Sequence, residues 1–249
     1  MRPFVKKIKP ASGFSYITHL ALLVLLPFAL FVLVRIYFIQ LAFILILLSK
    51  WRMFAVRPRF WVVNIRANSV DMIVGFSALT LMLQTDSALW QAVWAVAYAA
   101  WLIAVKPRSS LFMTAVQAGI GFLAGLSALY ISWSDGPLIG LVFLTGLICY
   151  LVARHFFDSF EEPYAKLLAY LWGYFGAALM WVLGHWLLFY GAIAQPTILL
   201  VAIGYGLAAL YYLDHFDKLS VTVRRQLLFI MIAIVVIVLS LSNWGNKVV

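Results

Sequence analysis

The chain has 249 residues, of which 66% are hydrophobic and only 10% are charged, and its formal net charge is +10. A soluble domain carries roughly 25% charged residues, so this chain has too few polar side chains to cover a water-soluble fold. In lipid every backbone polar group must find its hydrogen bond within the segment, and runs this apolar are therefore helices. Composition excludes a sizeable soluble domain and predicts an all-α, polytopic bundle of transmembrane helices.

Nine apolar runs predict about eight or nine membrane helices, because about 20 residues cross the hydrocarbon core. If the N-terminus is cytoplasmic, every basic residue except Arg35 and Lys247 lies on the cytoplasmic side, as the positive-inside rule requires. We therefore expect one integral membrane domain over residues 1–249, in a bacterial plasma (inner) membrane. The runs are 16–34, 36–49, 70–85, 88–105, 110–132, 137–153, 167–190, 196–213 and 226–242.

The first two runs form a predicted hairpin over residues 16–49. Each arm has about 15 residues, or roughly 22 Å of helix, which is short of the roughly 30 Å hydrocarbon core. The arms are either two short, tilted spans with Arg35 at the far interface, or a re-entrant hairpin bent near Pro27. In the second case Arg35 is buried beside Gln40. A charge inside the membrane is a functional-site hypothesis by default, so Arg35 is a candidate residue.

Residues 50–66 form a predicted basic interfacial loop before an array of helical hairpins over residues 70–242. Aromatic side chains interleave with its cations, an arrangement that suits the inner membrane interface. We expect contacts with anionic lipid headgroups there, and docking of a protein partner is the alternative use. The net charge follows from such loops, and no nucleic-acid partner is expected. The candidate lipid contacts are Arg52, Arg57, Arg59 and Arg66.

Small residues line one face of the run at 110–132, in the sequence AGIGFLAGLSA. Ala118, Gly121, Gly125 and Ala128 recur at helical spacing, which lets a second helix approach closely. The pattern predicts a packing seam inside the bundle. At the start of the run at 70–85, Asn68 is expected to cap a helix, with Asp71 in its positively polarised first turn.

Two predicted cytoplasmic loops carry similar polar clusters, HFFDSFEE and DHFD. Histidine with carboxylates suits Zn²⁺ or Mn²⁺, and carboxylates alone suit Mg²⁺, so a metal or phosphate-ester site at this membrane face is one interpretation. The other is that these are solvated loop residues that balance nearby cations and favour a helix start. The candidate residues are His155, Asp158, Glu161, Glu162, Asp214, His215 and Asp217.

Three classes of function remain open for the chain. A small transporter or permease-like protein and a membrane subunit or scaffold are the favoured ones, and a lipid-modifying enzyme with a metal-dependent cytoplasmic site is the alternative. No nucleotide-binding glycine motif is present, and no cofactor is predicted. The sequence does not specify a cargo.

Overall fold

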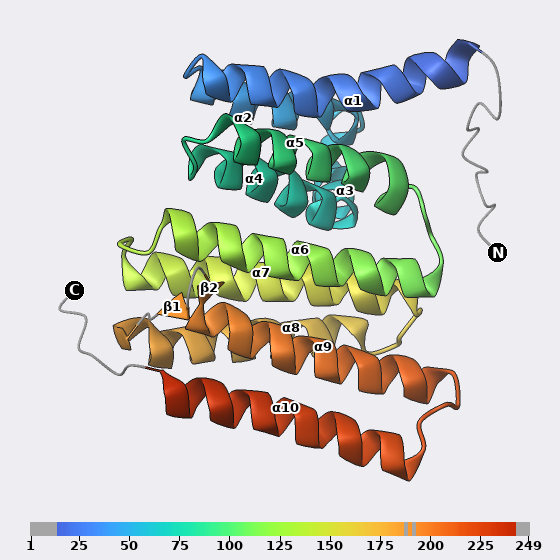
Figure 1. Cartoon of the computed structure of the whole chain (residues 1–249). Helices are drawn as coiled ribbons and strands as arrows, with labels where there is room; N and C mark the ends of the chain where they lie inside the picture. Colours follow the sequence, from blue (N-terminus) through green and yellow to red (C-terminus); the bar gives the residue numbers. More distant parts are fainter. Residues whose placement is uncertain (1–13, 187–188, 191–192, 243–249) are drawn as a thin grey trace.

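The computed structural model describes residues 14–186, 189–190 and 193–242, and this part of the chain is almost entirely helical (Figure 1). Two short strands, β1 (Phe189–Tyr190) and β2 (Ile193–Ala194), pair antiparallel. The helices are α1 (Phe14–Arg35), α2 (Ile39–Ser49), η1 (Trp51–Met53), η2 (Pro58–Phe60), α3 (Trp61–Ala67), α4 (Ser69–Leu83), α5 (Ala88–Ala100), η3 (Trp101–Val105), α6 (Leu111–Ser132), α7 (Leu138–Ser159), α8 (Ala165–Leu183), η4 (Gly184–Trp186), α9 (Gln195–His215) and α10 (Val221–Leu241).

The predicted all-α bundle is confirmed, and six helices in the described residues are long and apolar enough to cross a membrane. They are Ala88–Val105, Leu111–Ser132, Leu138–Ser159, Ala165–Trp186, Gln195–His215 and Val221–Leu241. Three further apolar helices are shorter: Ala21–Arg35, Ile39–Ser49 and Ser69–Leu83. The expected count of eight or nine spans depends on these three and stays a prediction.

From α1 at the top of Figure 1 to α10 at the bottom the helices lie side by side, with α5 between α1 and α4. Helix α4 packs on α5 and α6, α7 packs on α6 and α8, and α9 packs on α6 and α10. Most loops that carry cations gather at one end of the bundle, on the right of Figure 1. We call it the basic end, and it is marked by Lys50, Lys106, Arg154 and Lys218.

Close helix contacts depend on glycine at several positions. A Cβ placed on Gly121 of α6 would lie 2.8 Å from Val70 Cγ1, and one on Gly125 would lie 2.7 Å from Ile73 Cγ2. Both contacts are made with α4, and Ala118 and Ala128 on the same face of α6 are buried as well. The two glycines of the small-residue face thus lie against α4, where larger side chains would separate the helices.

The first hairpin differs from its expected dimensions. Helix α1 is continuous through Pro27 and extends to Arg35, so the first arm is longer than the sequence suggested. Arg35 lies at the turn into α2, is exposed, and donates from Nη1 to the backbone carbonyl of Asp86 at 3.5 Å. Gln40 is also exposed. Whether this end of the hairpin lies at the far membrane interface stays a prediction.

Candidate functional site

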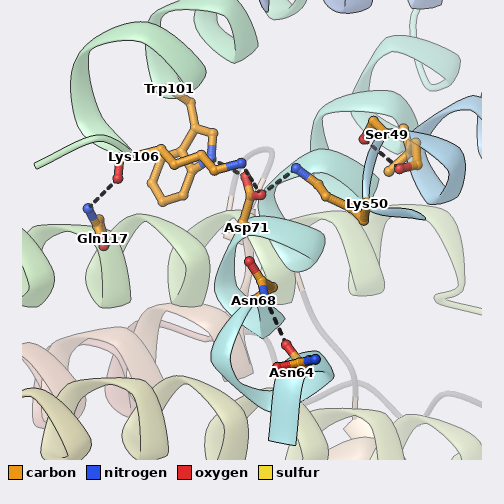
Figure 2. A network of polar contacts seen from close by, with 9 residues as sticks. Ser49, Lys50, Asn64, Asn68, Asp71, Trp101, Lys106 and Gln117 are labelled. Carbon is orange, nitrogen blue, oxygen red and sulfur yellow. Dashed lines mark hydrogen bonds and ion pairs between the residues drawn. The ribbon is translucent and has the colours of Figure 1, made fainter. Parts of the chain in front are cut away.

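Three helices meet around one carboxylate at the basic end of the bundle (Figure 2). Asp71, in the first turn of α4, accepts from the ammonium of Lys50, which follows α2. Its Oδ2 also accepts from Lys106 Nζ at 2.6 Å, and its Oδ1 accepts from Trp101 Nε1 at 3.0 Å. Lys50 and Asp71 are each 7% exposed. A buried carboxylate therefore accepts from three donors that come from two other chain segments.

A π-helical turn brings two of these donors to the same side. In an α-helix, positions five residues apart point about 140° away from each other, so Trp101 and Lys106 would not reach one partner. Segment η3 is instead π-helical, and Lys106 N donates to Trp101 O at 2.9 Å. This i→i+5 hydrogen bond places the two residues above one another on the same face of the helix. Such π-helical turns occur frequently at functional sites.

The charge balance of this cluster is unequal, since two ammonium groups share one carboxylate. Burial lowers the pKa of Lys50 below its usual value, and Lys106 lowers that pKa further, while Asp71 opposes the shift.

One turn deeper, the Tyr98 side chain is 1% exposed and faces Gly75. Its hydroxyl has no hydrogen-bond partner among the described residues.

Gln117 of α6 extends the polar network to the neighbouring helices (Figure 2). Its Nε2 donates to Val105 O at 2.9 Å and to Arg108 O at 2.8 Å, which satisfies carbonyls at the end of η3. Its Oε1 lies 3.3 Å from His155 Nε2 on α7. The amide thus ties the α5–η3 segment to α6 and α7.

Of the two expectations about the start of α4, the cap is wrong and the first-turn carboxylate is confirmed. Asn68 makes no capping hydrogen bond, and its Nδ2 donates backwards to Asn64 O at 2.8 Å. Asp71 lies in the first turn of α4 as expected, and it also forms ion pairs with two lysines. A buried carboxylate next to cations is more stable than one that relies on the helix dipole alone, because charge-assisted hydrogen bonds are stronger.

The seven acidic and histidine candidates at this end make separate contacts. His155 lies against Gln117, Asp158 pairs with Arg154 at 2.9 Å, and Tyr211 donates to Glu162 Oε2 at 2.6 Å. The remaining four, Glu161, Asp214, His215 and Asp217, are exposed. Within the described residues, no three His, Cys, Asp or Glu side chains are grouped so that they could hold a metal ion. A metal role for them stays a prediction.

The segment over residues 50–66 is largely helical, with η1, η2 and α3 in place of the expected loop. Arg57 and Arg59 are exposed, and the Arg59 guanidinium lies 4.6 Å above the Phe60 ring. Arg66 is half-buried, and its Nε lies 3.9 Å from Asp158 Oδ2. The side chain of Arg52 lies outside the described residues. Contact with anionic lipid is untested for all four arginines.

An apolar cavity of about 430 Å³ lies among α6, α7, α8 and α9. Its size falls in the range of small-molecule sites, about 300–1,000 Å³. Leu171, Phe175 and Leu207 line it and are exposed at the surface of the bundle. The cavity therefore opens sideways between α8 and α9. Other lining residues include Ala115, Gly119, Phe122, Phe156, Trp172, Gly204, Ala208 and Tyr211.

Sequence reasoning found neither the ion-pair cluster nor the cavity. In the sequence, Lys50 and Lys106 indicated only which side of the membrane their loops face, since cations near helix ends are common in membrane proteins. The scarcity of acidic residues in an apolar run was the one usable signal for Asp71, because a buried carboxylate needs a cationic partner.

No known protein family, curated protein or solved structure matches the chain. The class of protein therefore follows from fold and composition alone. The chain forms an apolar helical bundle with six helices able to span a bilayer, which is compatible with a multi-pass membrane protein.

Proposed function

We propose that this chain is a lipid-handling membrane protein of the transporter or scaffold class, which holds the hydrocarbon chain of a membrane lipid in the cavity between α8 and α9. The apolar, laterally open cavity is the observation that supports the proposal. An acyl or isoprenoid chain in the bilayer can enter it without crossing an aqueous phase. Burial of the lipid chain in the cavity is favourable because the chain gains more close van der Waals contacts with tightly packed protein atoms than it makes with fluid lipid.

The lining chemistry favours a hydrophobic cargo over a polar solute. A polar solute needs hydrogen-bonding groups near the middle of the membrane to replace its lost water. The described lining is mostly aliphatic and aromatic, and its polar side-chain groups are the hydroxyls of Tyr205 and Tyr211 and the indole N–H of Trp172. The hydroxyl of Tyr211 already donates to Glu162. The alternative, a metal-dependent lipid-modifying enzyme, has no comparable support, since the described residues hold no group of three metal ligands.

Photo-crosslinking of the full-length protein in detergent tests the proposal. A trace phospholipid with a diazirine on its acyl chain should label peptides of α8 and α9, and excess unlabelled phospholipid should suppress the label. Ala208→Phe, which fills the cavity, should remove this saturable label. Ile232→Phe on α10, where the parent side chain is 60% exposed, is the matched control and should keep it.

Equal labelling of parent and Ala208→Phe would contradict the proposal, because lipid would then contact only the outer surface. Reconstitution in vesicles separates the two uses of a bound lipid. Transbilayer movement of a fluorescent phospholipid that the Ala208→Phe variant lacks would indicate a transporter. Saturable binding without movement would indicate a scaffold.

A further inference from the structure

A second polar cluster lies on the other side of α7 and α8 from the cavity, near the basic end. Arg154 Nη2 donates to Asp158 Oδ1 at 2.9 Å, and Arg66 Nε of α3 lies 3.9 Å from the other oxygen of that carboxylate. On α8, Lys166 Nζ lies 5.9 Å from the Tyr170 ring centre. That ring stacks on Tyr150, one turn before Arg154 on α7, with centroids 4.9 Å apart.

Arg154 has more donors than the described protein satisfies. Its side chain is only 14% exposed, and its Nε and Nη1 atoms are buried with no hydrogen-bond acceptor among the described residues. Leaving buried donors unpaired is unfavourable, and more so for a charged group. A guanidinium inside a membrane protein normally pairs with a carboxylate, a carbonyl or a phosphate.

Charge and surroundings together identify the class of ligand. Arg66, Arg154 and Lys166 are three cations, and in the described ranges Asp158 is the one carboxylate within ion-pair distance of the two arginines. Phosphate oxygens accept from a guanidinium in a bidentate manner. Beside the cluster, α8 exposes apolar side chains along which acyl chains can lie, namely Leu167, Tyr170 and Tyr174.

We infer that Arg66, Arg154 and Lys166 form a binding site for the phosphate of an anionic phospholipid. The headgroup lies between α3 and α8, and the guanidinium of Arg154 supplies the unpaired donors after rotation about its last side-chain bonds. This site is separate from the cavity and does not depend on the proposed function.

Native mass spectrometry of the delipidated full-length protein, titrated with phosphatidylglycerol or phosphatidylcholine, tests the site. The parent should bind phosphatidylglycerol more tightly than zwitterionic phosphatidylcholine. Arg154→Gln should weaken phosphatidylglycerol binding roughly tenfold to hundredfold, because hydrogen bonds to a charged group are lost. Arg225→Gln, which removes an exposed cation from the same end of the bundle, should leave the affinity unchanged.

Unchanged affinity in Arg154→Gln, or an equal loss in Arg225→Gln, would overturn the site. Inorganic phosphate distinguishes a lipid from a free anion: if it competes as well as phosphatidylglycerol at equal concentration, the assignment to a lipid is wrong.

Stability gives an independent readout. Lipid-free Arg154→Gln should unfold no more readily than the parent, and only the parent should gain stability from phosphatidylglycerol. A purely structural Arg154 would instead give a variant that is destabilised with and without lipid.

Discussion

Lys106 Nζ lies 2.6 Å from Asp71 Oδ2, although the two residues are 35 positions apart in the chain. The contact joins the end of the α5–η3 segment to the first turn of α4, and Lys50 joins the end of α2 to the same carboxylate. Three helical segments are therefore held in register by one buried acidic group. The loss of stability expected for a substitution in this cluster depends on which charged side chain is left without a counter-charge.

Asp71→Ala should be the most damaging change in the cluster. It leaves the buried ammonium of Lys50 without a carboxylate, and breaking a buried pair in this way costs about 3–5 kcal/mol. The free energy of unfolding in mixed micelles, followed by circular dichroism during a denaturant titration, measures the loss. Asp86→Asn is the control, because Arg35 contacts only the backbone carbonyl of Asp86. A loss no larger in Asp71→Ala than in this control would show that the cluster does not stabilise the bundle.

Lys50→Met should cost far less than Asp71→Ala, although both remove the same ion pair. The methionine keeps the apolar stem, and Asp71 retains Lys106 and Trp101 as donors. Removing one partner of a buried pair is costly chiefly because the other charge is left uncompensated. Asp71 keeps Lys106 as a counter-charge here, so we expect a change of only about 1 kcal/mol. The same unfolding titration checks the order of the two variants, and equal losses would contradict it.

The helices were largely predictable, because long apolar runs in a membrane protein are typical of helices. Six of the nine predicted runs match helices to within three residues at each end in the described part. Helix α7 continues six residues beyond its predicted run, α10 begins five residues before its run, and the run expected to continue to residue 190 gives α8 only to Leu183. Beyond it come η4 and the paired strands β1 and β2. Apolar composition does not distinguish a helix from a short extended segment, so the end of α8 could not be predicted from the sequence.

The cluster around Asp71 was not predictable from periodicity. Its lysines are 21 and 35 residues away in the sequence, so their pairing depends on tertiary packing. The π-helical turn also breaks the 3.6-residue rule, and that rule alone would place Trp101 and Lys106 on different faces. The cavity was not predictable for a related reason, because its lining comes from four helices, α6 to α9, whose packing no local residue pattern specifies.

Gln117→Leu should loosen the junction of η3, α6 and α7. The change leaves the carbonyls of Val105 and Arg108 without their side-chain donor. Unpaired acceptors in a partly buried site cost about 1–3 kcal/mol, and we expect a loss in this range. Thermal unfolding in detergent measures it against Gln40→Leu, whose parent side chain is exposed at the other end of the bundle. Matching melting temperatures for the two variants would contradict a structural role for the Gln117 amide.

Gly121→Ile should separate α6 from α4. A Cβ at this position already lies 2.8 Å from Val70, so the larger side chain overpacks the contact, which costs about 1–3 kcal/mol. Leu123→Ile is the matched control, because Leu123 is 41% exposed on the same helix. The difference in unfolding free energy between the two variants is the measurement. A Gly121→Ile protein as stable as the control would mean that α4 and α6 do not approach closely at Gly121.

Cysteine labelling should show that the two ends of the bundle face opposite sides of the membrane. Asp86 and Lys218 are both exposed and lie at opposite ends, whereas the native Cys149 is buried and should not react. If the basic end is cytoplasmic, a membrane-impermeant maleimide should label Asp86→Cys in intact cells. Lys218→Cys should react only after the membrane is opened, and the parent chain provides the unlabelled control. The reverse pattern would mean that the basic end faces outward, and labelling of both cysteines from one side would contradict the transmembrane arrangement itself.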